Sequence, residues 1–284
     1  DDGEEVMADY GMLRRKAHEI RTLTLETIGH VGKGHLGGCM SLCEVMSVLY
    51  FSQMNVRPEE PQWKHRDRFI LSKGHAGPGV YSALALRGDF DREALKSLNE
   101  LGTNIPSHCD ATRTTGVDVT TGSLGQGFSV AVGIALAAKL DREELYVYPV
   151  IGDGESQEGL VWEAAMLAGN RGLDNIIGFT DYNNLQIDGH VSEVNGLEPL
   201  ADKWAAFGWD VQSVDGHDVE EIDRVVSRAK QSRGKPHMII LRTVKGKGIS
   251  FAEDLVTNHS MTISGDMLER EMKRLRGGGE RDEV

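Results

Sequence analysis

The chain has 284 residues, of which 39% are hydrophobic and 26% charged, so it can build the core of one large domain or two small ones. Its net charge of −13 argues against nucleic acid or an anionic membrane surface as a partner. Three cysteines form an odd and sparse set, which indicates a reducing compartment rather than a disulfide framework.

The chain is expected to begin with a helix that leads into a glycine-rich loop. Residues 12–30 carry apolar side chains at helical spacing. The loop at 29–38 follows and contains His35 among five glycines. This histidine therefore lies on a flexible backbone between two helices.

A second helix is expected from Ser41 to about Gln53, with Glu44 three residues after the serine as a capping box. Cys39 and Cys43 lie four residues apart at its start. A zinc site there is disfavoured, because such sites usually need four organised ligands.

The middle of the chain is expected to continue with a strand and two helices. The strand at 66–71 ends in a Gly-His turn that carries His75, and a helix starts near Gly79. A helix of small residues follows at 128–140; its apolar run is too short to span a bilayer. The acidic N-terminus lacks a signal-peptide pattern, so we expect a cytoplasmic protein.

The centre of the chain is expected to form a strand–helix–strand unit. Apolar runs at 145–151 and 175–179 predict two strands, and residues 157–171 predict the helix between them, with Gly172 as its C-cap. Such a unit makes the two strands parallel, with both carboxyl ends at the same edge of the sheet. The helix face expected to be buried consists of Trp162, Ala165, Met166, Ala168 and Gly169.

The remaining residues continue this alternation without a linker, which predicts an α/β fold: a doubly wound, mostly parallel sheet with helices on both faces. We expect one domain over residues 1–265, then a C-terminal helix end and a flexible tail at 266–284, where three consecutive glycines follow Arg274. The later elements are helices near 197–207 and at 219–231, and strands at 209–214 and 237–243.

Two polar motifs follow the two central strands, where open α/β sheets bind ligands. Gly152-Asp153-Gly154-Glu155 follows the first strand, and Asn183-Asn184-Leu185 follows the second. Mg²⁺ prefers oxygen ligands and usually shares itself between protein carboxylates and phosphates. We predict a metal site made of the Asp153 carboxylate, the Asn183 side-chain oxygen and the Leu185 carbonyl, with Gly152 and Gly154 close to a diphosphate.

The spacing of these motifs resembles the signature of thiamine-diphosphate enzymes, and the longer strings at 152–159 and 181–189 resemble transketolases. Three other strings occur in the order that this family uses: Gly-His-Leu-Gly at 34–37, Lys-Gly-His-Ala at 73–76 and the glycine-rich run at 120–127. Leu36 stands where the family has a proline, which affects the stiffness of the loop.

The resemblance implies thiamine diphosphate as cofactor, with Mg²⁺ (or Ca²⁺ or Mn²⁺) as its metal. It also implies that four histidines are catalytic: His35 and His108 contact the substrate, and His75 and His259 lie at the diphosphate. Glu158 matches a glutamate that links two sites across a subunit interface in the family. The implied cofactor-binding residues are His75, Gly122, Ser123, Leu124, Gly152, Asp153, Gly154, Glu155, Asn183 and His259.

A transketolase moves a two-carbon ketol unit from a ketose, or ketose phosphate, to an aldose or aldose phosphate. The resemblance covers only the first part of a full-length enzyme, the pyrophosphate-type domain. We therefore expect the N-terminal subunit of a split transketolase, active only with a pyrimidine-domain subunit, in a heterotetramer built as a dimer of heterodimers.

Three alternatives stay open at this point. The first is a transketolase that acts on an unusual sugar, such as a sulfo- or branched sugar. The second is a subunit of another thiamine-diphosphate enzyme, of the 2-oxoacid dehydrogenase or deoxyxylulose-phosphate synthase type. The third is a non-enzymatic assembly subunit that binds the cofactor.

Overall fold

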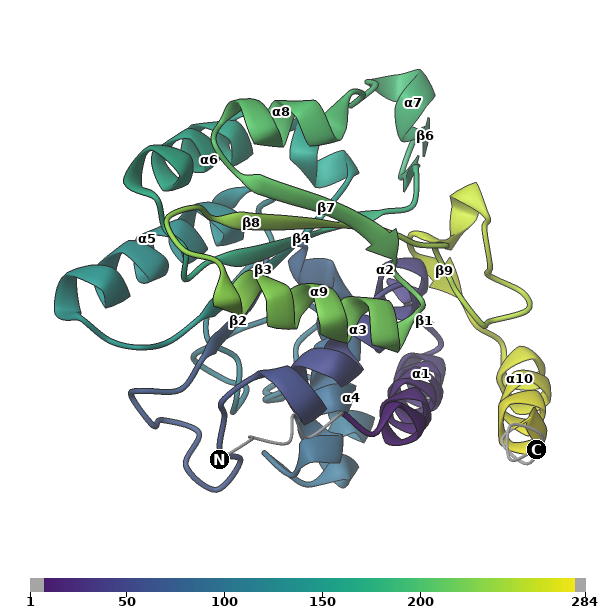
Figure 1. The fold of residues 1–284 in the computed structure, drawn as a ribbon. Helices are drawn as coiled ribbons and strands as arrows, with labels where there is room; N and C mark the ends of the chain where they lie inside the picture. The colour runs from purple at the N-terminus through teal and green to yellow at the C-terminus, as the bar shows by residue number, and fades with distance from the viewer. Residues whose placement is uncertain (1–7, 279–284) are drawn as a thin grey trace.

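A five-stranded parallel sheet forms the centre of the molecule (Figure 1). The structure, a computed structural model, describes residues 8–278. Every neighbouring pair of strands is parallel, so the carboxyl ends of all five lie at one edge. In spatial order the strands are β2 (Arg68–Leu71), β3 (Val147–Gly152), β4 (Ile177–Tyr182), β8 (His237–Arg242) and β7 (Asp210–Asp215).

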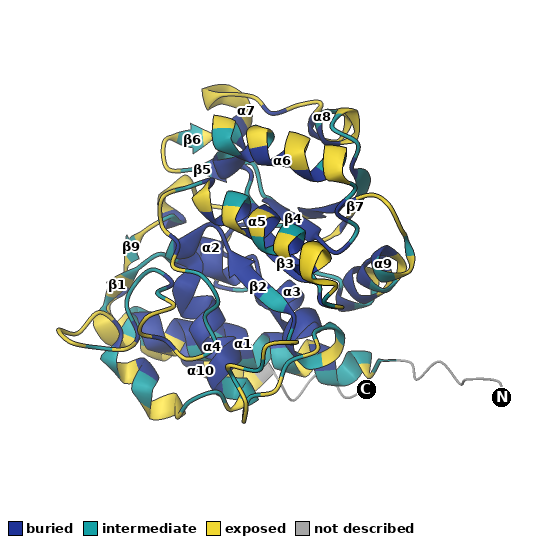
Figure 2. Ribbon diagram, turned by 90° about the vertical axis from the view of Figure 1, so that its left-hand side faces the viewer, coloured by how far each residue is buried: buried dark blue, intermediate teal, exposed yellow. Residues whose placement is uncertain are grey.

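Helices cover both faces of this sheet, which confirms the predicted doubly wound α/β fold (Figures 1 and 2). Alternate residues of β3 serve the two cores: Tyr148 and Val150 belong to one, and Val147 and Ile151 to the other. The first core contains α1 (Tyr10–Val31), α2 (Leu36–Met40), α3 (Cys43–Val48), α4 (Gly77–Arg87) and α9 (Val219–Gln231). The second contains α5 (Gln126–Asp141), α6 (Gly159–Arg171) and α8 (Leu200–Ala206).

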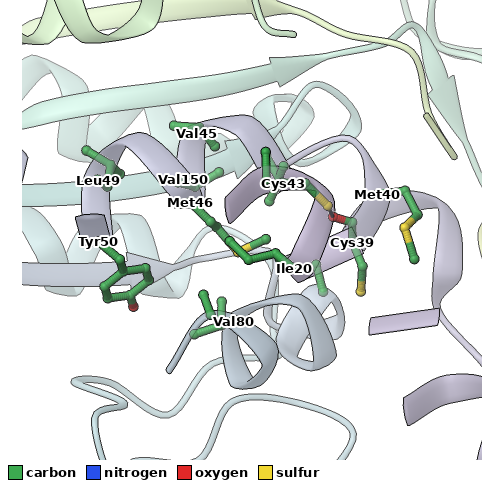
Figure 3. Close-up of a cluster of buried hydrophobic side chains, with 14 of the residues drawn as sticks. Ile20, Cys39, Met40, Cys43, Val45, Met46, Leu49, Tyr50, Val80 and Val150 are labelled. Atoms are coloured by element: carbon green, nitrogen blue, oxygen red, sulfur yellow. Dashed lines mark hydrogen bonds between the residues drawn. The ribbon is translucent and has the colours of Figure 1, made fainter. Parts of the chain in front are cut away.

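All three cysteines are core residues of the first cluster. Figure 3 shows Cys39 and Cys43 among Met46, Val80 and Val150, and both cysteines are fully buried. Burial raises the pKa of each thiol to about 12. Within residues 8–278, no three His, Cys, Asp or Glu side chains are grouped to hold a metal.

The predicted helix at Ser41–Gln53 differs from the observed one at both ends. The helix α3 begins at Cys43, and a π-helical turn replaces its last part at Leu49–Gln53. The capping box is wrong, because the Ser41 hydroxyl donates to Asp181 (2.6 Å) instead of capping the helix. The hydroxyl donates to a buried carboxylate, and such a charge-assisted hydrogen bond is stronger than one between neutral groups.

The central helix is shorter and less buried than expected. The segment Gly154–Gln157 forms a 3₁₀ turn, so α6 starts at Gly159. It ends at Arg171, and Gly172 follows with a left-handed φ of 56°, which confirms the predicted C-cap. Met166 was expected to be buried but is 57% exposed. The sheet contacts only the narrow alanine stripe of this helix.

The C-terminal segment is more ordered than its composition predicted. Helix α10 spans Gly265–Gly278, so the flexible end expected from Arg274 is wrong as far as Gly278; residues 279–284 lie outside the described residues. Met272 and Leu275 are buried against the first core and hold this helix in place. No helix within residues 8–278 combines the length and apolar character needed to cross a bilayer.

Two short antiparallel pairs complete the fold. Strand β1 (Lys33–Gly34) pairs with β9 (Met261–Thr262), which joins the loop after α1 to the segment after β8. Strand β5 (Leu185–Gln186) pairs with β6 (Gly189–His190), and α7 (Val191–Val194) follows it. The pair of β5 and β6, with α7, directly follows the carboxyl end of β4.

Candidate active site

The two predicted motifs meet where β3 and β4 end side by side. The Asp153 Oδ2 atom accepts hydrogen bonds from the backbone N–H groups of Asn183 (2.9 Å) and Asn184 (2.5 Å). Its Oδ1 atom accepts one from the N–H of Gly154 (2.8 Å). The register of the strands explains the meeting. Gly152 pairs with Asp181, and Asp153 and Asn183 follow them by one and two residues. The carboxylate is therefore fixed by backbone atoms of both motifs.

The oxygen atoms around Asp153 suit a hard divalent cation. The Asn183 Oδ1 atom accepts from the N–H of Leu185 (3.1 Å), which fixes the amide side chain beside the carboxylate. Burial, and then the charge of Asp181, raise the pKa of Asp153 to about 6, so a cation beside it would stabilise its anionic form. One carboxylate is too few for an all-protein cage, which fits a cation shared with a phosphate ligand.

A cavity of about 230 Å³ lies directly over these motifs. It is lined by residues at or after the ends of β3 and β4, by residues after β2 and β8, and by Gly38 of α2 and Leu124 before α5. His35, His108, Gly122 and Ser123 are not part of this lining. The predicted site residues that line the cavity are His75, Leu124, Gly152, Asp153, Gly154, Glu155, Asn183, Leu185 and His259.

The four predicted histidines form one cluster, although they come from four separate loops. The His35 ring lies 5.3 Å from His75, 5.5 Å from His108 and 5.4 Å from His259, measured between ring centroids. The rings of His75 and His259 are 4.8 Å apart. Pairing of β1 with β9 explains the long-range contact, because His35 directly follows β1 and His259 precedes β9 by two residues.

All four histidines are held in the neutral form. Burial is the first cause in each case, and it lowers the pKa of His259 to about 4, with help from Lys245. The pKa of His75 lies well below its ordinary value, and those of His35 and His108 are also lowered. Neutral rings each offer one donor and one acceptor, so the cluster can bind hydroxyl groups and move protons.

His35 has a nitrogen available for a ligand. Its Nδ1 atom is buried and makes no hydrogen bond within residues 8–278. A buried polar atom without a partner costs about 1–3 kcal/mol, which a hydrogen bond to a ligand would offset. Close packing holds the loop, since a Cβ on Gly37 would lie 2.3 Å from the Asn258 side chain.

Glu155 lines the cavity and also braces the site. Its carboxylate accepts hydrogen bonds from the N–H groups of Gly125 (2.8 Å) and Gly152 (3.0 Å) and from the Ser72 hydroxyl. Burial raises its pKa, and these three donors oppose that rise. The residue therefore ties the run that contains Gly122, Ser123 and Leu124 to the end of β3.

Three charged residues of the site were not identified from the sequence. The Lys73 ammonium donates to the Gly38 carbonyl (2.9 Å) and to Asp181 Oδ2 (2.5 Å), and both charged side chains are buried. Lys245 donates to the Leu185 carbonyl (3.0 Å) and lies 3.3 Å from His259 Nδ1. Burial, and then Lys73, lower the pKa of Lys245 to about 8.

A signal for each was present in the strings already singled out. Lys73 opens the Lys-Gly-His-Ala string at 73–76 and Asp181 opens the string at 181–189, whereas Lys245 follows the predicted strand at 237–243. All three are charged residues at or just after the carboxyl end of an apolar strand. A charge at that position needs a partner, and only groups of the site are near enough to provide one. Glu158 is exposed at the start of α6 and lines the cavity, and its role across an interface stays a prediction.

Comparison with known proteins gives a consistent result. Residues 13–278 match the family described as "Transketolase, thiamine diphosphate binding domain". The chain is 57% identical over 255 residues to the 6-deoxy-6-sulfo-D-fructose transketolase subunit of Clostridium sp. (strain MSTE9), covering 90% of this chain and 93% of the relative. It is 37% identical over 263 residues to an apulose-4-phosphate transketolase subunit of Phocaeicola vulgatus, covering 93% of each.

The fold agrees with solved structures of full-length transketolases. The Campylobacter jejuni transketolase superimposes with a TM-score of 0.88 at 34% sequence identity. That alignment covers 94% of this chain but 43% of the other. The chain therefore corresponds in length to the relatives named as subunits and to less than half of the Campylobacter jejuni transketolase.

Proposed function

Because the chain belongs to the transketolase family, we propose that it is the cofactor-binding subunit of a two-chain transketolase whose donor is 6-deoxy-6-sulfo-D-fructose. The chain is a transketolase subunit that transfers ketol groups. What we propose beyond this is that the donor sugar is sulfonated. The observation that carries this step is the 57% identity to a subunit of that specificity, against 37% to the apulose-4-phosphate subunit.

The residues of the site fit thiamine diphosphate with Mg²⁺. Thiamine diphosphate, when bound, supplies the electron sink that allows a ketose C–C bond to break. The orphaned His35 Nδ1 atom and the single-carboxylate donor set both call for an added ligand. Asp153, Asn183 and the Leu185 carbonyl would hold the cation, which Ca²⁺ or Mn²⁺ can replace.

The other residues divide between the two ends of the cofactor. His75, His259 and Lys245 line the cavity beside the metal ligands and would hold the diphosphate with the backbone of Gly152 and Gly154. The run at 122–124 lies against His108, since a Cβ on Gly122 would be 3.4 Å from its ring, and would support the thiamine rings. His35 and His108 would bind sugar hydroxyls and the carbonyl and would exchange protons with them.

A second chain would complete the cleft. The relatives of matching length are named as subunits, and the single-chain enzymes are more than twice as long. The partner we propose is a chain with a pyrimidine-type domain, in a dimer of heterodimers with Glu158 at the contact between two sites. Three cysteines buried in the reduced form support a cytoplasmic location.

Donor specificity tests the proposal directly. The chain is purified with its partner, and kcat/KM is measured for 6-deoxy-6-sulfo-D-fructose and for fructose 6-phosphate, with an aldose phosphate as acceptor. Loss of two carbons from the six-carbon donor must release a four-carbon sulfo-aldose, which mass spectrometry detects. We expect at least a tenfold preference for the sulfonated donor; preference for fructose 6-phosphate or for a branched donor would reject it.

The metal assignment has its own test. In Asp153→Ala the cation loses its charged protein ligand, so Mg²⁺-dependent binding of thiamine diphosphate should fall by more than about 100-fold. Titration calorimetry of the assembled enzyme measures this, with Asp202→Ala on α8, an exposed carboxylate, as control. Unchanged affinity in Asp153→Ala would remove this residue from the site.

A further inference from the structure

The loop at 244–247, which places Lys245 in the cavity, is held from outside by three side chains. Val244 donates its N–H to His217 Nε2 (2.9 Å), and His217 Nδ1 lies 3.1 Å from Glu44 Oε2. Arg21 donates from Nη2 to Glu44 Oε1 (2.6 Å) and from Nε to the Lys247 carbonyl (2.9 Å). The chain of hydrogen bonds thus starts at one end of the loop and returns to the other; we name it the Arg21–Glu44–His217 clamp.

The hydrogen-bonding role of each group in the clamp is fixed. A backbone N–H only donates, so His217 Nε2 must accept and the ring proton lies on Nδ1, where it faces Glu44. Burial opposes ionisation of Glu44, but Arg21 and then His217 outweigh it and lower its pKa. Arg21 and Glu44 are each 8% exposed, so this ion pair is shielded from solvent.

The backbone of the loop is shaped around the clamp. Gly248 has a φ of 79°, and a Cβ there would lie 2.7 Å from Arg21 Cδ. Gly246 has a φ of 81° and donates its N–H to the Gly37 carbonyl (3.0 Å) in the His35 loop. The Lys245 carbonyl accepts from Asn258 Nδ2 (3.0 Å), next to His259. A shift of the loop would therefore move Lys245 and disturb two histidine segments.

We propose that Arg21, Glu44 and His217 are positioning residues, which fix Lys245 where it binds the diphosphate of the cofactor. None of the three lines the cavity formed by the described residues, so they act through the loop. This inference rests on the proposed cofactor site. It assigns to these three side chains a control of cofactor affinity.

A double-mutant cycle tests the inference, because residues that act through a common group are not additive. Binding of thiamine diphosphate with Mg²⁺ to the assembled enzyme is measured by titration calorimetry. We expect His217→Leu to weaken binding about tenfold and Lys245→Met to weaken it at least as much. The double variant should bind within about twofold of Lys245→Met, because the clamp has no lysine left to position.

Two further variants separate positioning from general loss of stability. His237→Leu removes another buried histidine, at the opposite end of β8, and should leave the affinity unchanged. His217→Gln keeps an acceptor and a donor and should restore binding to within about threefold of wild type. If His217→Leu does not fold, the cycle is made with His217→Asn.

The outcomes are distinct. If wild type binds the cofactor and the two losses multiply in the double variant, the clamp proposal is wrong and the proposed function stands. An equal loss in His237→Leu would also overturn the clamp proposal. If wild type with its partner does not bind the cofactor, the proposed function fails and the inference fails with it.

Discussion

At the scale of single residues, two buried lysines determine how the site is charged. Lys73 is paired with Asp181, and Lys245 lies beside His259. Both cations are close enough to the histidine cluster to lower the pKa of His75. They add to burial in keeping the histidine rings neutral at pH 7. The positive charge suits an anionic diphosphate, and the neutral rings suit the uncharged hydroxyls of a sugar.

The histidines should separate into two kinetic classes. His75 and His259 line the cavity beside the metal ligands, whereas His35 and His108 lie outside its lining. Alanine at 75 or 259 should weaken cofactor binding about tenfold or more, and alanine at 35 or 108 should mainly lower kcat/KM for the sugars. Calorimetry and steady-state kinetics on the four variants measure the two effects. If both pairs alter cofactor affinity equally, the division is wrong.

Stability should depend on pH through His259. Its folded pKa is about 4, below its unfolded value, so between pH 6.5 and 4 the unfolded state binds more protons and stability falls as pH falls. His259→Gln should recover about 1 kcal/mol of the loss between pH 7 and pH 5, after allowance for partial exposure of the ring. Urea unfolding of both proteins at the two pH values measures this. Equal pH slopes would contradict the lowered pKa.

At the scale of elements, the parallel sheet could be predicted because each strand is a short apolar run. The Asp153–Asn183 contact followed from the strand–helix–strand rule, since both motifs end neighbouring strands. Contact between His35 and His259 could not be derived in this way, because it depends on the two-residue pair of β1 with β9. Such short pairs leave no periodic pattern in the sequence, and the family resemblance placed both histidines in the site without indicating that they touch.

Buried charges explain the other failures. Ser41 has the spacing of a helix cap, but Asp181 lies across the core and takes its hydroxyl. Lys73 was read as part of a string around His75, because nothing local reveals that a carboxylate 108 positions away in the sequence pairs with it. The error at Met166 has a different cause: the residue follows the apolar spacing of its helix, yet its side chain is exposed to solvent.

Close packing of the His35 loop against the segment before His259 should be sensitive to one methyl group. In Gly37→Ala the new Cβ would lie 2.3 Å from Asn258 Oδ1 and 2.8 Å from its carbonyl oxygen, so one loop must move. We expect a loss of about 1–3 kcal/mol of stability and a large fall in kcat/KM. Thermal unfolding and kinetics measure both. Gly265→Ala is the control, since its Cβ would meet nothing within 4 Å; an active, stable Gly37→Ala would refute this packing.

At the scale of the whole molecule, apolar side chains are exposed on one outer surface. Val130 (43%) and Leu140 (74%) on α5, and Met166 (57%) and Leu167 (41%) on α6, are open to solvent. Figure 2 shows exposed positions along these two neighbouring helices. Glu158, at the start of α6, is exposed beside this surface. Exposed apolar side chains on adjoining helices are typical of a surface that contacts another protein chain.

The 284-residue chain alone should be catalytically silent. The groups assigned here serve the metal, the diphosphate and the sugar, whereas family resemblance places the glutamate that activates the cofactor in the pyrimidine-type domain. A cleft with one wall also stays open to water, which weakens the electrostatic effect of Lys73 and Lys245 on bound anions. The apolar surface on α5 and α6 should drive self-association of the unpartnered chain.

Ketol transfer is therefore measured with this chain, with its partner and with their mixture, and light scattering follows the size of each. The mixture should turn over and bind thiamine diphosphate more tightly than either chain, because both contribute to one cleft. Met166→Glu should disrupt the assembly and lower activity without changing the fold, since that side chain is exposed. Glu163→Gln on the same helix, also at an exposed position, is the control. Full turnover by this chain alone would show that the cleft needs no second wall and would reject the two-chain enzyme.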